Sequence, residues 1–443
     1  MGGLMLKVRF SRNLGYVAIA GAALSSAGAY AQTSPLSNPQ PVLPYDYPSD
    51  RTAANERYRP EYSAEGLRLG GLTVHPELTG GIGYTSNVYG DVNNAASDIY
   101  ALIRPSLTID GSGGAERRGY QIALDANLRR YSDEKTANQT ALNASASGTL
   151  PIGGGGYIAL GGGAHRSYES QESSSFPGAS IAPIRYDEYI GYLRVSTGGS
   201  RLRLIAGIDA NDDKFGNGKR ADGTLIDQSS RDRLVLRGSA RLETSLTGAT
   251  SAYVEGRYSD INYKRDIIAL GLENRDGKQA ELLAGFKIDS GKFRGALAAG
   301  YTRRTYDFAL YRDFGGLAVN GEVTYFATGL STFTLAAYRN IAESGDPSIS
   351  GQFNTGASIR VDHELLRYII LTGRVSYDVT SYRGAGRKDK IASVTGGVRY
   401  LANRRLEFGG NATYLKRNSN NSLVFGSADF DRFEATATVT GRF

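Results

Sequence analysis

The chain has 443 residues, of which 51 are Lys or Arg and 44 are Asp or Glu, and its formal net charge is +7. It contains no cysteine, which excludes disulfides and thiolate metal sites. The basic residues are spread along the chain and form no block, so the charge gives no indication of nucleic-acid binding.

Residues 1–31 have the features of a secretory signal peptide, and we expect export through the Sec pathway. These features are a positive region with Lys7, Arg9 and Arg12, an apolar stretch from Leu14 to Leu24, and the cleavage motif Ala29-Tyr30-Ala31. No second long apolar stretch follows, so the sequence offers no transmembrane helix.

Residues 32–71 are expected to form a periplasmic arm that either docks export partners or plugs the lumen. Asn, Ser and Asp residues lie between its prolines, which favours an extended and weakly ordered segment. The prolines are Pro35, Pro39, Pro41, Pro44, Pro48 and Pro60.

From Leu72 to Phe443, apolar or small residues alternate with polar ones. A period of two predicts strands with one apolar and one polar face. The last strand shows the pattern clearly, with Phe433, Ala435, Ala437, Val439 and Gly441 on its apolar face. We expect eighteen strands, near residues 72–84, 99–110, 119–132, 139–151, 156–169, 186–197, 200–212, 230–246, 251–264, 279–289, 292–307, 317–327, 330–342, 351–363, 368–382, 389–401, 405–417 and 430–443.

The connections between these strands alternate between short and longer, more polar segments. This alternation and an even strand number are typical of bacterial outer-membrane barrels, which have short periplasmic turns and long outer loops. We therefore predict an all-β fold, a transmembrane antiparallel β-barrel over residues 72–443, in the outer membrane of a Gram-negative cell. The last strand should pair with the strands near 72–84 and 405–417 and so close the sheet. The alternatives are a soluble β-sandwich and a β-propeller, although no four-strand sequence repeat is visible.

Aromatic residues near the predicted strand ends indicate two interfacial girdles. Toward the longer loops these residues are Tyr84, Tyr100, Tyr131, Tyr168, Tyr186, Tyr258, Tyr301, Tyr338, Tyr377 and Tyr414. Toward the short turns they are Tyr120, Tyr157, Tyr253, Phe293, Phe333, Tyr368, Tyr400 and Phe443.

The polar face of the predicted strands carries both signs of charge. Eighteen strands about 4.8 Å apart and tilted by about 40° enclose a diameter on the order of 35 Å, which side chains cannot fill. Arginine forks suit carboxylates, so such a wall could bind an acidic polysaccharide weakly and let it slide. The alternative is that cross-strand ion pairs only brace a hydrated wall. The candidate lumen-lining residues are Arg104, Arg129, Arg194, Arg203, Arg237, Arg241, Arg257, Arg360, Arg374, Glu243, Glu255 and Asp362.

We predict no enzyme activity, no metal site and no cofactor. The three histidines, His75, His165 and His363, are too far apart in the sequence to indicate a metal-ligand cluster. His165 and Ser167 share one strand face and could form a hydrolase pair, but the sequence identifies no third residue to orient the histidine.

Four stretches at the start of the predicted barrel resemble a known family. They are Arg59-Pro60-Glu61-Tyr62, Gly66-Leu67-Arg68-Leu69-Gly70-Gly71-Leu72, Pro76-Glu77-Leu78 and Tyr84-Thr85-Ser86-Asn87-Val88-Tyr89. They are similar to the lead-in of the β-barrel porin type 2 family, and the resemblance covers about residues 60–443. It implies a barrel of similar size without catalytic residues and, for some members, the export of exopolysaccharide beside periplasmic export lipoproteins.

We therefore expect a monomeric conduit for exopolysaccharide. Its expected partners are outer-membrane lipid, the barrel-insertion machinery, periplasmic polysaccharide-export proteins and an acidic polysaccharide. We expect the insertion machinery to read Phe433, Val439 and Phe443 as an assembly signal. Two alternatives remain open: a porin for small hydrophilic nutrients, and a structural or adhesive barrel that presents its outer loops.

Overall fold

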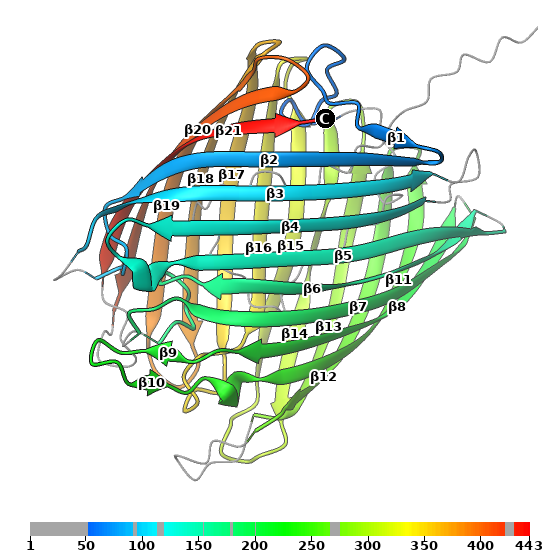
Figure 1. The fold of residues 1–443 in the computed structure, drawn as a ribbon. Helices are drawn as coiled ribbons and strands as arrows, with labels where there is room; N and C mark the ends of the chain where they lie inside the picture. Colours follow the sequence, from blue (N-terminus) through cyan, green and yellow to red (C-terminus); the bar gives the residue numbers. More distant parts are fainter. Residues whose placement is uncertain are drawn as a thin grey trace, which may run out of the picture.

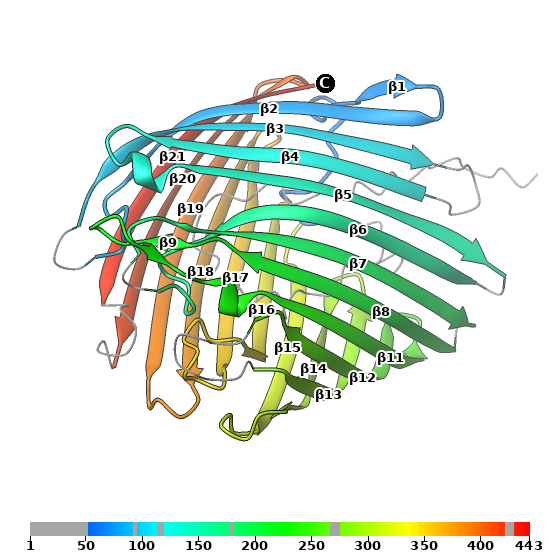
Figure 2. The ribbon, with the colours of Figure 1, turned by 60° about the horizontal axis from the view of Figure 1, so that its bottom comes forward.

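The chain folds into a closed antiparallel β-barrel of eighteen strands, in which β2–β8 and β11–β21 follow one another around the wall (Figures 1 and 2). The computed structural model describes residues 52–91, 95–112, 119–153, 155–177, 180–199, 201–265, 275–420 and 429–443. The predicted signal peptide and residues 32–51 of the predicted arm lie outside the described residues.

Every predicted strand range overlaps one observed strand, and no end differs by more than three residues. The strands are β2 (Leu72–Thr85), β3 (Asp98–Ser112), β4 (Gly119–Tyr131), β5 (Gln139–Ile152), β6 (Gly156–Glu169), β7 (Ile184–Gly198), β8 (Leu202–Phe215), β11 (Arg233–Thr247), β12 (Thr250–Tyr263), β13 (Gly277–Asp289), β14 (Phe293–Tyr306), β15 (Phe314–Phe326), β16 (Ser331–Ala342), β17 (Gln352–Leu366), β18 (Ile369–Tyr382), β19 (Lys388–Leu401), β20 (Leu406–Ser419) and β21 (Phe430–Arg442). Outside the wall, β1 (Leu67–Leu69) pairs with β2, and β9 (Gly218–Lys219) pairs with β10 (Leu225–Ile226).

The two faces of the wall differ as the alternation predicts. Large apolar side chains are exposed on the outer face of every barrel strand, for example Phe433 and Val439 on β21. The residues between them, such as Glu434, point to the inner face and are buried or half-buried. An apolar outer face fits a hydrocarbon environment, and the closed ladder leaves no wall strand without a partner on either side.

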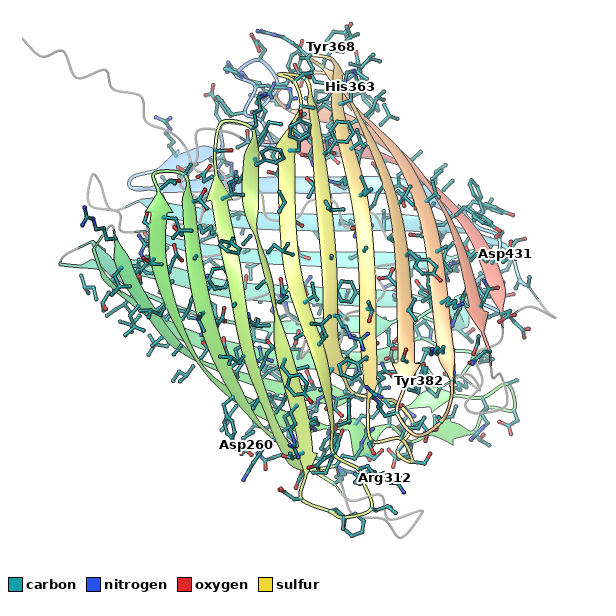
Figure 3. The ribbon with its side chains drawn as sticks, turned by 180° about the vertical axis from the view of Figure 1, so that it is seen from behind. Asp260, Arg312, His363, Tyr368, Tyr382 and Asp431 are labelled. Atoms are coloured by element: carbon teal, nitrogen blue, oxygen red, sulfur yellow. The ribbon has the colours of Figure 1, made fainter. Side chains whose placement is uncertain are left out.

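The barrel has two different ends, which we call the turn end and the loop end. At the turn end, short connections such as residues 248–249 and 367–368 join the strands, and the carboxyl terminus lies there. At the loop end the connections are longer, for example residues 170–183 and 216–232. Figure 3 shows His363 and Tyr368 at the turn end and Arg312 at the loop end. In the described part of the chain no helix is long and apolar enough to cross a membrane.

The predicted aromatic girdles are only partly correct. Tyr84, Tyr258, Tyr301, Tyr377 and Tyr414 near the loop end are exposed on the outer face, as are Tyr120, Phe293, Phe333, Tyr368, Tyr400 and Phe443 near the turn end. By contrast, Tyr100, Tyr131, Tyr157 and Tyr253 are buried on the inner face. The prediction used distance from the strand end and ignored strand parity, which decides the face.

The closing seam joins the first and last barrel strands. β2 pairs with β21 from Glu77 to Thr85, and β20 pairs with the other edge of β21. Inside the seam, the hydroxyl groups of Thr79 and Thr440 lie 2.8 Å apart. Backbones approach closely at Gly81, where a Cβ atom would lie 2.6 Å from the carbonyl oxygen of Ala437.

We predict that Gly81→Ala weakens barrel closure, because the added methyl group forces the two strands apart. Overpacking of this kind costs about 1–3 kcal/mol. Gly80→Ala is the matched control, since a Cβ atom there meets nothing within 4 Å. The measurement is the fraction of heat-modifiable barrel after refolding into lipid vesicles, followed by urea unfolding. Equal behaviour of the two variants would contradict the importance of this contact.

Candidate functional site

The inner face of strands β7–β13 forms a charged wall. The guanidinium group of Arg194 bonds the carboxylate of Asp209 on the next strand. Glu255 lies between two arginines, accepting from Arg241 at 2.9 Å and from Arg257 at 2.7 Å. The Arg257 side chain then reaches Glu281 at 2.8 Å, so the charges continue from strand to strand.

The inner face of strands β15–β21 and β2 also carries charged residues, such as Arg374 and Asp378, but pairs of hydroxyl side chains lie among them. Neighbouring hydroxyl side chains hydrogen-bond each other across the strands with oxygen separations of 2.8–3.0 Å. These pairs are Thr324 with Thr334, Ser376 with Ser393, Thr395 with Thr413, and Thr79 with Thr440. We call this surface the hydroxyl wall.

The β6–β7 loop, residues 170–177, folds into the barrel and crosses to the opposite side. Tyr382 donates a hydrogen bond of 2.6 Å to the carbonyl oxygen of Ser174, and the side chain of Gln352 donates one of the same length to the Ser174 hydroxyl. Gln352 begins β17, which is separated from β6 by eight strands in either direction around the barrel. The loop therefore spans the lumen.

Buried ion pairs hold this crossing loop in place. Arg432 on β21 binds the carboxylate of Glu172 at 2.5 Å, and both side chains are nearly inaccessible to solvent. Arg417 on β20 donates to the carbonyl oxygen of Gln171 at 3.0 Å. Burial raises the pKa of the Glu172 carboxyl, but the charge of Arg432 and the hydrogen bonds outweigh it, so the pKa lies below its ordinary value.

A second inward loop, residues 343–351, meets the first. Glu343 is buried against Arg304 at 3.1 Å and also accepts a hydrogen bond from the Tyr263 hydroxyl. Burial raises the pKa of the Glu343 carboxyl, but the charges of Arg304 and neighbouring arginines lower it by more. The pKa therefore lies below its ordinary value. The hydroxyl of Ser175 donates to the carbonyl oxygen of Glu343 at 3.0 Å. The two loops together obstruct the loop end of the lumen.

At the turn end, residues 52–66 lie against the inner wall. Arg59 binds the buried carboxylate of Glu364 at 2.7 Å, and Arg57 reaches the same carboxylate at 3.3 Å. Ala54 is fully buried, and its backbone N–H donates to the Thr332 hydroxyl at 3.3 Å. Further bonds come from Arg399 to the carbonyl oxygen of Asn55 and from Arg442 to that of Tyr62. This segment covers part of the second opening.

The twelve predicted lining residues all alternate with the exposed apolar side chains of their strands, but they form three separate groups. Arg194, Arg203, Arg237, Arg241, Arg257, Glu243 and Glu255 lie on β7–β12. Arg360, Asp362 and Arg374 lie on β17 and β18, where Arg360 binds Asp362 at 2.9 Å. Arg104 and Arg129 lie on β3 and β4, and Arg129 binds Glu434 at 3.2 Å. Their role in a transport path stays a prediction, as does the assembly role of Phe433, Val439 and Phe443.

Sequence reasoning missed the charges that fix the inward loops. The carboxylates are Glu169, Glu172 and Glu343, and their arginine partners are Arg231, Arg432 and Arg304. Strand parity places Arg304 and Arg432 on the inner face, so those two could have been found. No periodic signal marks Glu172 or Glu343, because both lie in irregular loops.

In the described residues, His165 lies in a row of polar side chains and does not pair with Ser167. The ring of His165 contacts the side chain of Asn143 at 3.2 Å, and Asn143 in turn donates to Asp125 at 2.7 Å. This row of side chains does not include Ser167. Within the described ranges no group of three or more His, Asp or Glu residues could hold a metal ion.

Residues 59–443 match the family described as "Putative beta-barrel porin 2". The chain belongs to this family. It is an outer-membrane β-barrel porin-like channel, as the resemblance of its lead-in motifs implied. None of the curated proteins is significantly similar to this porin in sequence.

Several solved porins are similar to this family member at low sequence identity. OccK2 (OpdF) of Pseudomonas aeruginosa is 13% identical over 84% of this chain and 97% of its own, with a TM-score of 0.43. OpdK of the same organism, solved with vanillate, is 12% identical over 84% and 99%, with a TM-score of 0.45. The anion-selective porin from Comamonas acidovorans is 10% identical over 84% and 99%, with a TM-score of 0.37.

We predict that Glu172→Gln releases the crossing loop of this porin and raises its single-channel conductance. The substitution leaves Arg432 buried without its carboxylate, and breaking such a pair costs about 3–5 kcal/mol. Asp222→Asn, on the exposed β9–β10 hairpin, is the control and should leave conductance unchanged. Planar-bilayer recordings of both variants decide the matter, and equal conductance in all three proteins would show that the loop does not limit flow.

The buried ion pairs of Glu172 and Glu343, which hold the two inward loops, also predict that conductance depends on pH. Because the pKa values of Glu172 and Glu343 lie below those of free carboxyls, the ion pairs contribute fully above the ordinary glutamate pKa. Their contribution is lost as the pH falls through the lowered pKa values. Conductance of the native protein should therefore be constant near neutral pH and rise only in strong acid, whereas Glu172→Gln should show raised conductance already at neutral pH.

The segment at the turn end, residues 52–66, should also depend on its ion pairs. Glu364→Gln should free residues 52–66, because Arg57 and Arg59 lose their shared carboxylate. Glu61→Gln is the matched control, since its ion pair with Arg367 is exposed and contributes little. The measurement is limited trypsin cleavage after Arg57 in the folded barrel, which should accelerate about tenfold or more only in Glu364→Gln. Equal cleavage rates would show that other contacts hold the segment.

Proposed function

We propose that this porin-like channel passes secreted exopolysaccharide and works with periplasmic export proteins. The observation that carries the proposal is the division of the inner face into a charged wall and a hydroxyl wall. A sugar chain offers both hydroxyl groups and, if it is acidic, carboxylates, so each wall suits one part of such a cargo.

The hydroxyl wall supports sliding of a polymer. Its Ser and Thr side chains already hydrogen-bond one another, as between Thr395 and Thr413 at 3.0 Å. A passing sugar hydroxyl can replace such a bond by a similar one, so no position holds the chain tightly. On the charged wall, Arg241 and Arg257 are bound to Glu255, so a carboxylate of the cargo competes with an existing partner. Weak, repeated sites of this kind favour movement over retention.

The covered ends support regulated export. The inward loops obstruct the loop end, and residues 52–66 cover part of the turn end, so both ends of the lumen are at least partly covered. In this proposal, a periplasmic export partner displaces residues 52–66 as it docks. The segment is suited to this role because its bonds to the wall come mainly from a few side chains, among them Arg59.

A second candidate function is passive uptake of small hydrophilic nutrients. The observation that favours it is the pair of inward loops, since a lumen divided by residues 170–177 and 343–351 leaves narrower passages that suit small solutes. In this case the loops stay in place during transport, and no partner is required.

The experiment that tests the proposal compares surface polysaccharide in cells with and without this porin. We expect the deletion strain to lose surface polysaccharide and to regain it with the native chain. With the purified protein, removal of the turn-end cover by Glu364→Gln should allow acidic oligosaccharides to interrupt the ion current, with longer interruptions for longer chains. Unchanged surface polysaccharide, together with rapid small-solute flux in liposome-swelling assays, would reject polysaccharide export and favour nutrient uptake.

A further inference from the structure

The outer face of the barrel is electrically asymmetric. In the described strands, every outward-facing charged residue lies within the four residues nearest the loop end. Ten are basic: Arg130, Arg166, Arg185, Lys214, Lys278, Arg303, Arg339, Lys388, Lys390 and Lys416. Four are acidic: Asp187, Asp212, Asp260 and Asp431. The outward positions toward the turn end carry no Lys, Arg, Asp or Glu. If the two leaflets of the bilayer were alike, the outer face would not need charged residues near one end only.

Three of these ten cations have a carboxylate within 4.0 Å in the described part of the chain. Arg166 and Arg185 both contact Asp187, at 2.8 and 3.8 Å, and Arg303 contacts Asp313 at 3.4 Å. Such groups are already largely neutralised by the protein itself. A ligand with negative charge therefore gains less from binding to them.

Among the cations without such a partner, three lysines lie together on the neighbouring strands β19 and β20, and we call them the lysine triad: Lys388, Lys390 and Lys416. All three are exposed, and no carboxylate in the described part of the chain lies within 4.0 Å of their amino groups. The strand register places Lys390 opposite Asn418 and Lys416 opposite Ala392, so Lys390 and Lys416 are diagonal neighbours about 7–8 Å apart. Figure 3 labels Tyr382 and Asp431, which lie on β18 and β21, the strands that flank β19 and β20.

The level of the triad is set by the tyrosines beside it. Tyr414 is exposed two residues from Lys416 on the same face, and Tyr377 is exposed on β18 opposite Ala392. Exposed tyrosines mark the boundary between hydrocarbon and headgroups. The lysine amino groups therefore reach the headgroup layer of the leaflet at the loop end, which is the outer leaflet in bacterial barrels.

The neighbours of the triad are polar but uncharged. Lys388 lies opposite Ser381, and Lys390 lies opposite Asn418, so hydroxyl and amide groups flank the cations. One acidic residue faces the site: Asp431 lies opposite Lys416, and its carboxylate accepts a hydrogen bond from Tyr414 at 3.3 Å. Three cations thus face one carboxylate, surrounded by groups that can bond sugar hydroxyls.

We propose that the lysine triad binds the phosphorylated disaccharide headgroup of a lipopolysaccharide in the outer leaflet. Two phosphates on one saccharide can contact the diagonal lysines together, while Ser381 and Asn418 bond the sugar. A phospholipid carries a single phosphate and satisfies fewer of these groups at once. The site lies on the outer face, so the proposal is independent of what the lumen transports.

The test measures binding of diphosphorylated lipid A to the full-length protein in detergent. The variant Lys388→Gln/Lys390→Gln/Lys416→Gln should bind about a hundredfold more weakly, as expected for three lysines near an anionic headgroup. The control Arg201→Gln/Lys292→Gln/Arg367→Gln removes three exposed cations from the turn end and should bind like the native chain. Heat-modified mobility verifies that both variants fold.

Two further ligands separate the possible sources of the phosphate. Lipid A without phosphates should bind as weakly to the native chain as diphosphorylated lipid A binds to the triad variant. Phosphatidylglycerol in the same detergent should also bind weakly to the native chain. The proposal is overturned if the triad variant keeps native affinity, if the control loses as much, or if either of these ligands binds as tightly as diphosphorylated lipid A.

Discussion

The closed hydrogen-bond ladder is the constraint on which the rest of the structure depends. Hydrocarbon offers no hydrogen bonds to a free strand edge, so a spanning sheet must pair its first strand with its last. Here that requirement falls on β2 and β21, with Gly81 allowing the close approach and Thr79 and Thr440 joined inside. Closure also creates the inside, because it fixes one face of every strand toward the lumen.

Once the wall is closed, electrostatics decides what occupies the lumen. Charged side chains are costly to bury unless they are paired, and the inner wall offers many arginines. The inward loops bring carboxylates to them, as Glu172 does to Arg432 and Glu343 to Arg304. At the turn end the charges are exchanged between cover and wall. There the covering segment, residues 52–66, carries the cation Arg59, and the wall carries the carboxylate of Glu364.

The sequence predicted the wall well and the lumen poorly, for a physical reason. A strand that separates two environments must alternate, so the eighteen strands and the exposure of Phe433 and Val439 follow from a local pattern. The same parity would have placed Tyr100 and Tyr253 on the inner face. The pairing of Glu172 with Arg432 joins residues that are 260 positions apart in the sequence, and no local pattern indicates it. Contacts of irregular loops depend on where the closed barrel brings them, which only the fold determines.

The difference between wall and covers also bears on how the channel can open. Each wall strand is bonded along most of its length to two neighbours, so the wall can yield only by breaking many backbone bonds together. The covers are held by a few side-chain bonds each, such as Arg59 with Glu364 and Tyr382 with Ser174. Groups with few bonds open at low free-energy cost, while continuous ladders do not. Passage of a polymer through this barrel would therefore move the covers at its two ends and leave the wall unchanged.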